Sequence, residues 1–136
     1  MPIATDLDKM FIATALDSEG SLFGCIHKHG KLQKPSIQVY LTFTNNSLKW
    51  LELLKDLCGD GKIRRCTNSS AYTLSIEKQD SIKTILKAIF SYLIIKFEQA
   101  SLMINYLNRK NWYYNSSNYI FLESLSKLNS KRGREE

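Results

Sequence analysis

A single stretch decides the fold, Phe11-Ile12-Ala13-Thr14-Ala15-Leu16-Asp17-Ser18-Glu19-Gly20. Just before it, Thr5 and Asp8 have the spacing of a capping box, which predicts a helix from about Asp6 to Ser18. Gly20 is suited to the left-handed cap that ends a helix. Asp17 and Glu19 lie in the last turn, where the helix dipole is already negative, so this end of the helix favours a nearby cation. From these residues alone, an ordinary amphipathic helix with a polar end is an equally good interpretation.

The apolar residues of this helix form two stripes, Leu7, Phe11 and Ala15 in one and Ile12 and Leu16 in the other. Only a narrow polar side is left between them. A helix that buries two sides in a small domain can lie between its own sheet and a twin helix of a second subunit.

Two strand pairs are predicted after the helix. The apolar period changes to two between Ser21 and Phe43, with a turn at Gly30 and Pro35, and a second hairpin covers residues 62–76. In both, alternate residues are apolar, and the others are mostly polar or basic groups of the kind that contact base edges and phosphates. An ordinary solvent-exposed sheet face is the alternative. The predicted DNA-binding residues are Phe23, Cys25, His27, His29, Ser36, Gln38, Tyr40, Thr42, Lys62, Arg64, Cys66, Thr73 and Ser75.

Helical apolar spacing predicts a helix after Ser47, another that begins at Asp80 and a further one that ends near Leu107. A polar and aromatic connector, residues 108–118, leads to a last amphipathic helix, and residues 131–136 form a charged tail that we expect to be mobile. This order predicts an α+β fold, αββαββα with a curved antiparallel sheet, in a single domain of residues 1–130.

Two segments of the chain resemble the LAGLIDADG homing endonucleases. They are Ile12–Gly20 and the late segment Tyr92-Leu93-Ile94-Ile95-Lys96-Phe97-Glu98-Gln99-Ala100, and the order of the elements between them is similar as well. In that family the motif helices of two copies pack together, and the acidic residue before the final glycine binds a divalent metal ion. Here that residue is Glu19, where Asp is commoner, and Thr14 stands where the family usually has Gly.

The resemblance implies a site-specific homing endonuclease that hydrolyses both strands of double-stranded DNA with Mg²⁺ or Mn²⁺. Glu19 and the Ser18 carbonyl would hold the metal, and Glu19, Lys96 and Asn45 would be the catalytic residues, with Thr44 as the alternative to Asn45. Asp17 is assigned to holding the helix ends. One motif per chain implies a homodimer and a near-palindromic target. The predicted dimer interface is Phe11, Ile12, Ala13, Ala15 and Leu16.

Composition supports a polyanionic partner. The chain has 136 residues, 43% of them hydrophobic, and a net charge of +6 with a pI near 9.2. No signal peptide, membrane span or small-molecule substrate is predicted. Cys25, His27 and His29 alternate along one strand, a spacing too wide to chelate a single zinc ion easily. Three cysteines without a CxxC pair favour a reducing, intracellular location, in the cytoplasm, the nucleoid or an organelle.

Three other functions remain compatible with the sequence. The same scaffold could be an intron RNA maturase, which would bind intron RNA and cleave little DNA. It could be a DNA-binding regulator in which Glu19 has no catalytic role. The third is a small basic structural domain without a nucleic-acid partner.

Overall fold

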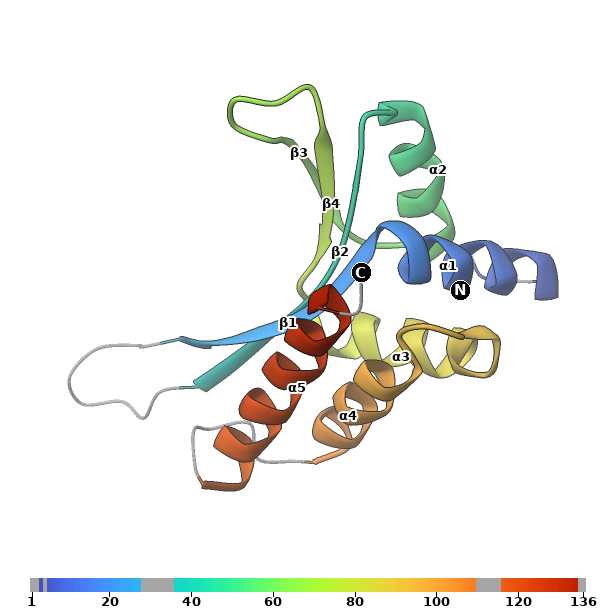
Figure 1. The fold of residues 1–136 in the computed structure, drawn as a ribbon. Coiled ribbons are helices and arrows are strands. Elements are labelled where there is room, and N and C mark those ends of the chain that lie inside the picture. Colours follow the sequence, from blue (N-terminus) through green and yellow to red (C-terminus); the bar gives the residue numbers. More distant parts are fainter. Residues whose placement is uncertain (1–2, 4, 28–35, 110–115, 135–136) are drawn as a thin grey trace.

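The computed structural model describes residues 3, 5–27, 36–109 and 116–134, and for residues 27, 116–118 and 131–134 it describes the backbone. The predicted α+β order is confirmed (Figure 1). In chain order the elements are α1 (Asp6–Glu19), β1 (Gly20–His27), β2 (Ser36–Asn45), α2 (Leu48–Cys58), β3 (Lys62–Arg65), β4 (Tyr72–Ile76), α3 (Gln79–Ile89), the 3₁₀ turn η1 (Phe90–Tyr92), α4 (Phe97–Leu107) and α5 (Ser116–Arg134).

The strands form one antiparallel sheet in the order β1-β2-β4-β3. Leu22 of β1 is opposite Leu41 of β2, and Phe43 of β2 is opposite Leu74 of β4. The apolar positions of the strands therefore share one side of the sheet. Along β2 this side is fully buried, at Ile37, Val39, Leu41 and Phe43. The predicted alternation of core and polar positions is therefore correct.

Helices cover only one side of the sheet. In Figure 1 the β1–β2 hairpin points to the lower left and the β3–β4 hairpin points upward, which gives the sheet its curvature. The helices lie to the right of the strands and below them, and none of the described helices lies in the angle between the two hairpins. No described helix therefore covers the polar side of the sheet.

The start of α1 agrees with the prediction, but its end does not. Thr5 Oγ1 accepts a hydrogen bond from the Asp8 amide at 3.1 Å, and the Thr5 amide donates to the Asp8 carboxylate at 3.2 Å. Gly20 has φ −101° and ψ 170°, so it is extended and begins β1 instead of forming a left-handed cap. A Cβ at Gly20 would lie 2.7 Å from the Leu16 Cα. Glycine is needed here because the chain passes close to the helix that it has just left.

The second helix begins and ends as its sequence predicts. Ser47 Oγ accepts a hydrogen bond from the Trp50 amide at 3.2 Å, and Gly59, with φ 77°, is the left-handed cap that ends α2. The Trp50 ring contacts Phe11 of α1, with ring centroids 6.1 Å apart. Trp50 therefore helps to join α1 and α2.

The last helix packs on the sheet and is longer than expected. The Phe121 ring stacks on Tyr106 with 4.4 Å between centroids, and Asn129 donates a hydrogen bond to the Leu22 carbonyl at 3.0 Å. α5 continues to Arg134, so residues 131–134 of the predicted charged tail are helical, and residues 135–136 lie outside the described part. Most of the predicted connector, residues 110–115, is outside it too. No described helix is both long and apolar enough to cross a bilayer.

Candidate functional site

The strand register brings the predicted DNA-binding side chains to the open side of the sheet. Phe23 pairs with Tyr40 and Cys25 with Gln38 in the first hairpin, and the same side continues through Thr42, Ser75, Thr73, Lys62 and Arg64. Cys66, just after β3, shares this side because its amide donates to the Ala71 carbonyl and its thiol lies 3.2 Å from the Thr73 hydroxyl. The His27 backbone pairs with Ser36, while His29 lies outside the described residues. We call this surface the polar sheet face.

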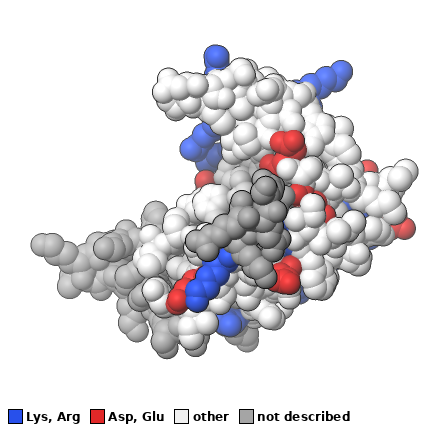
Figure 2. Space-filling model, in the orientation of Figure 1, with Lys and Arg blue, Asp and Glu red and all other residues white. Residues whose placement is uncertain are grey.

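Among the described residues, positive charge on the polar sheet face is concentrated in one hairpin. Lys62 and Arg64 of β3 are exposed and stand opposite Ser75 and Thr73 of β4. Figure 2 shows basic side chains at the upper end of the molecule, where the β3–β4 hairpin and α2 lie. Arg65 alternates to the other side of β3, where it lines a groove beside α2 with Glu52 and Asp56. The hairpin therefore presents basic groups on both of its sides.

An aromatic pair marks the other hairpin. The Phe23 and Tyr40 rings stack with centroids 4.9 Å apart, and Phe23 is 39% exposed. The Cys25 thiol lies 4.0 Å from the Tyr40 hydroxyl. Partial burial raises the pKa of Tyr40, and the hydrogen bond with Cys25 raises it further. The Tyr40 hydroxyl thus stays protonated and can donate as well as accept.

Glu19 ends α1 at the edge of this face. Its side chain is exposed, and the next residue already belongs to β1. The Ser18 hydroxyl donates to the Thr14 carbonyl at 2.8 Å, so it is used within the helix. The Ser18 carbonyl is in the last turn, where carbonyl groups have no partner further along the helix. A carboxylate and main-chain carbonyls are hard oxygen ligands of the kind that Mg²⁺ and Mn²⁺ prefer, so the residues present fit the implied metal.

Asp17 ties the end of α1 to the start of α4. Its carboxylate is 7% exposed and accepts hydrogen bonds from the amides of Ile94, Ile95 and Lys96 at 2.8, 3.1 and 2.9 Å. These amides belong to the turn just before α4, which begins at Phe97, and buried amides need such an acceptor. The assignment of Asp17 to holding the helix ends is therefore supported directly by these contacts.

The Lys96 side chain is buried, although apolar residues on both sides of it in the sequence are exposed. It is 3% exposed, whereas the flanking Ile94 and Phe97 are 85% and 45% exposed. Its ammonium donates to the Asp17 carbonyl at 3.2 Å. From the sequence alone we would expect the apolar neighbours to be buried and the lysine ammonium to extend to solvent. The positive charge is thus fixed beside the turn of α1 that carries Glu19.

The two candidates at the end of β2 lie on opposite sides of the sheet. Asn45 follows Phe43 on the helix side, and its Oδ1 accepts a hydrogen bond from the Ser47 amide at 2.7 Å. Thr44 is exposed on the polar sheet face, with its hydroxyl 3.0 Å from that of Thr73. The side-chain positions thus favour Thr44 over Asn45 for contact with a ligand on that face.

The predicted dimer interface needs correction. Ile12, Ala13, Ala15 and Leu16 are at most 2% exposed within a single chain, and Phe11 is partly buried against Trp50. They pack in the core of the protomer and offer no surface for a second copy. The exposed side of α1 consists instead of Leu7, Met10, Thr14 and Ser18.

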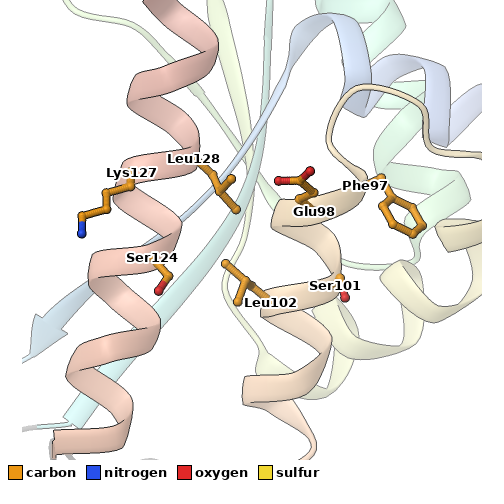
Figure 3. A pocket seen from close by; sticks show the side chains of 7 residues that line it. All are labelled: Phe97, Glu98, Ser101, Leu102, Ser124, Lys127 and Leu128. Carbon is orange, nitrogen blue, oxygen red and sulfur yellow. The ribbon is translucent and has the colours of Figure 1, made fainter.

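A separate groove lies between α4 and α5 (Figure 3). Its volume is about 460 Å³, and Figure 3 shows Leu102 and Leu128 pointing into the space between the helices. It has none of the predicted site residues. It is lined by Phe97, Glu98, Ser101, Leu102, Ser124, Lys127 and Leu128.

This chain, with its curved antiparallel sheet covered by helices on one side, has the fold of the LAGLIDADG homing endonucleases. The resemblance seen in the sequence is thereby confirmed in the structure. No family model matches the sequence, and no curated protein sequence matches it significantly.

Three solved structures illustrate the similarity. The homing endonuclease I-CvuI, in complex with a DNA target in the presence of Mg, is 22% identical with a TM-score of 0.69, over 93% of this chain and 80% of that one. The archaeal intron-encoded I-Vdi141I, complexed with DNA, is 15% identical with a TM-score of 0.67, over 91% and 98%. The LAGLIDADG meganuclease I-AabMI, bound to uncleaved DNA, is 20% identical with a TM-score of 0.68, over 86% of this chain and 43% of that one.

Proposed function

We propose that this protein is a homodimeric, Mg²⁺-dependent homing endonuclease that cuts both strands of a near-palindromic DNA site. The observation that carries the proposal is the position of Glu19, which is exposed where α1 ends and β1 begins, two residues after Asp17, whose carbonyl accepts a hydrogen bond from the Lys96 ammonium. A DNA-reading surface and a candidate metal ligand thus adjoin each other. The fold supports the proposal, because proteins that share it have been solved with DNA.

DNA would lie along the polar sheet face. A two-stranded ribbon fits a major groove, and the hydroxyl, amide and thiol groups of this face can meet the hydrogen-bonding edges of bases. Lys62 and Arg64, at the β3–β4 end, would neutralise phosphates. The two hairpins point in different directions, so each would contact a different segment of the duplex.

Glu19 would bind the divalent ion with the help of the Ser18 carbonyl. When bound, Mg²⁺ supplies a Lewis acid that stabilises the attacking and leaving oxygens of phosphodiester hydrolysis. Lys96, fixed through its hydrogen bond to the Asp17 carbonyl, would stabilise the negative charge that develops on the phosphate. Thr44, or Asn45 after a change of side-chain position, would bind the water or phosphate on the sheet side.

Two chains are needed to complete the site. Within the described residues no group of three or more Asp, Glu, His or Cys side chains could hold a metal ion, which supports a metal site shared between two chains. A twofold dimer would bring two copies of Glu19 to the axis. Three exposed apolar side chains could cover each other in such a dimer. They are Leu7 (76% exposed) and Met10 (45%) on α1, and Ile94 (85%) in the segment that Asp17 holds.

The first test separates binding from cleavage. The Glu19→Gln variant removes a metal-binding charge from an exposed position, so it should bind the selected DNA site as wild type does and lose cleavage in Mg²⁺. Binding is measured by fluorescence anisotropy and cleavage on a gel. Glu52→Gln, the same change on the exposed side of α2, is the matched control and should still cut. A Glu19→Gln protein that cuts at the wild-type rate would remove Glu19 from the site, and a wild type that binds without cutting would support the regulator or the maturase.

The second test concerns assembly. Leu7→Glu places a charge on the exposed side of α1 and should shift the protein from dimer to monomer in sedimentation velocity. Leu53→Glu is the control, because Leu53 is 49% exposed on α2, away from the proposed interface. A wild type that sediments as a monomer at all concentrations and on DNA would contradict the homodimer.

A further inference from the structure

Gln38 is fixed on the polar sheet face by two hydrogen bonds to the protein itself. Its Nε2 donates to the Val39 carbonyl at 3.1 Å and to the Glu77 carbonyl at 2.8 Å. The pairing of β2 with β4 ends at the Leu41–Ile76 pair. Gln38 lies beyond that pair, on the part of β2 that β4 no longer covers. The amide thus bridges the free edge of β2 and the residue that follows β4.

The two bonds also determine what Gln38 can offer to a ligand. A carboxamide has two N–H donors and one acceptor oxygen, and both donors are used. Because both partners are carbonyl oxygens, the opposite orientation of the amide would set oxygen against oxygen. The Oε1 atom has no hydrogen-bond partner among the described residues. Gln38 therefore presents an acceptor and no donor.

An apolar surface and a hydroxyl lie next to this acceptor. Gln38 is opposite Cys25, and Phe23 and Tyr40 form the neighbouring pair on the same side. Phe23 offers an exposed ring edge, and the Tyr40 hydroxyl can donate a hydrogen bond. We call Phe23, Gln38 and Tyr40 the reading triad. It combines one acceptor, one donor and one apolar contact.

These three groups match the major-groove edge of one kind of base pair. An A·T pair offers the adenine N6 amino group as a donor, the thymine O4 or adenine N7 as an acceptor, and the thymine C5 methyl as an apolar contact. A G·C pair offers a donor and acceptors but no methyl group. We infer that the Phe23, Gln38 and Tyr40 triad reads an A·T pair in each half-site of the DNA, with Phe23 against the thymine methyl group.

The inference rests on the proposed function, and base analogues test it separately. In a DNA site selected from a randomised library, each thymine of one half-site is replaced in turn by uracil, which lacks only the methyl group. At one position the wild-type Kd should rise about fourfold, the effect expected for one buried methyl group. Replacing the paired adenine by purine, which lacks the amino group, should raise the Kd about fivefold, as for one hydrogen bond. All measurements use one salt concentration.

A variant connects the effect to the triad. In Phe23→Ala the uracil substitution at that position should change the Kd by less than about 1.5-fold, because no ring remains to contact the methyl group. Tyr119→Ala removes an exposed aromatic side chain from α5 and should keep the fourfold effect. If Phe23→Ala does not fold, Phe23→Thr replaces it with a residue that favours strands.

The outcomes distinguish the two proposals. Specific binding without any uracil effect that depends on Phe23 would overturn the inference and leave the endonuclease proposal standing. Absence of specific DNA binding would overturn both.

Discussion

Replacing Asp17 should destabilise the protein more than any change at an exposed acid. Asp17→Ala removes the acceptor of three amide hydrogen bonds at the start of α4. Each partly buried amide left without a partner costs about 1–3 kcal/mol, and such costs within one network are not additive. We therefore expect a loss of about 3–5 kcal/mol in the free energy of unfolding, near the lower end of the sum for three such amides.

Asp17→Asn provides an internal scale for this loss. The two bonds at Oδ1 can persist with an amide oxygen, whereas the Ile94 bond at Oδ2 is lost together with the charge. We expect a cost of about 1.5–3 kcal/mol, the value of one hydrogen bond to a charged group. Asn thus should fall between Ala and wild type.

Urea unfolding followed by circular dichroism measures both variants at one protein concentration, because the proposed dimerisation would make stability depend on concentration. Asp56→Ala and Asp56→Asn make the same changes on an exposed side of α2 and should stay within about 0.5 kcal/mol of wild type. If both Asp17 variants also stay within that range, Asp17 does not hold α4 in place and the reasoning is refuted.

Three further outcomes are expected. Gly20→Ala should lower stability by about 1–3 kcal/mol in the same urea assay, since the new Cβ would lie 2.7 Å from the Leu16 Cα. An unchanged unfolding midpoint would show that the backbone adjusts to the methyl group without cost. Arg64→Ala should reduce the slope of log Kd against log salt for DNA by about one, whereas Lys87→Ala, on the exposed side of α3, should not, and equal slopes for both would argue against phosphate contact. Burial raises the pKa of Tyr106 to about 12, above its ordinary value near 10. The stability from the neutral phenol is therefore complete below about pH 10 and is lost as the pH rises toward 12, so wild type should lose stability more steeply over that range than Tyr106→Phe.

The parts of the fold that depend on local chemistry could be predicted from the sequence. The capping box of Thr5 and Asp8 involves residues three positions apart, and the alternation in β2 follows directly from the period of a strand. The polar sheet face was predicted for the same reason. Its continuity across both hairpins follows from the pairing of β2 with β4.

The errors concern features that depend on packing in three dimensions. Both sides of α1 carry apolar residues, and only packing on the sheet determines that Ile12 is buried and Leu7 is exposed. The role of Gly20 depends on how closely the chain passes Leu16 as it enters β1. Asn45 and Thr44 could not be distinguished, because a shift of one residue along a strand moves a side chain to the other face.

Lys96 illustrates why the candidate site could be predicted only in part. Its burial among exposed apolar neighbours depends on Asp17, which is 79 residues earlier in the chain. No local pattern around Lys96 carries that information. The family resemblance pointed to the residue, and the contacts with Asp17 give the physical reason for its position.

The most direct test of the central claim is cleavage of a randomised DNA library by the purified protein in Mg²⁺, with parallel reactions in EDTA and with Glu19→Gln, followed by sequencing of the ends. The proposed function predicts discrete, near-palindromic cut sites that disappear in both parallel reactions. Specific binding without cleavage in Mg²⁺, or cutting that persists with Glu19→Gln, would contradict it.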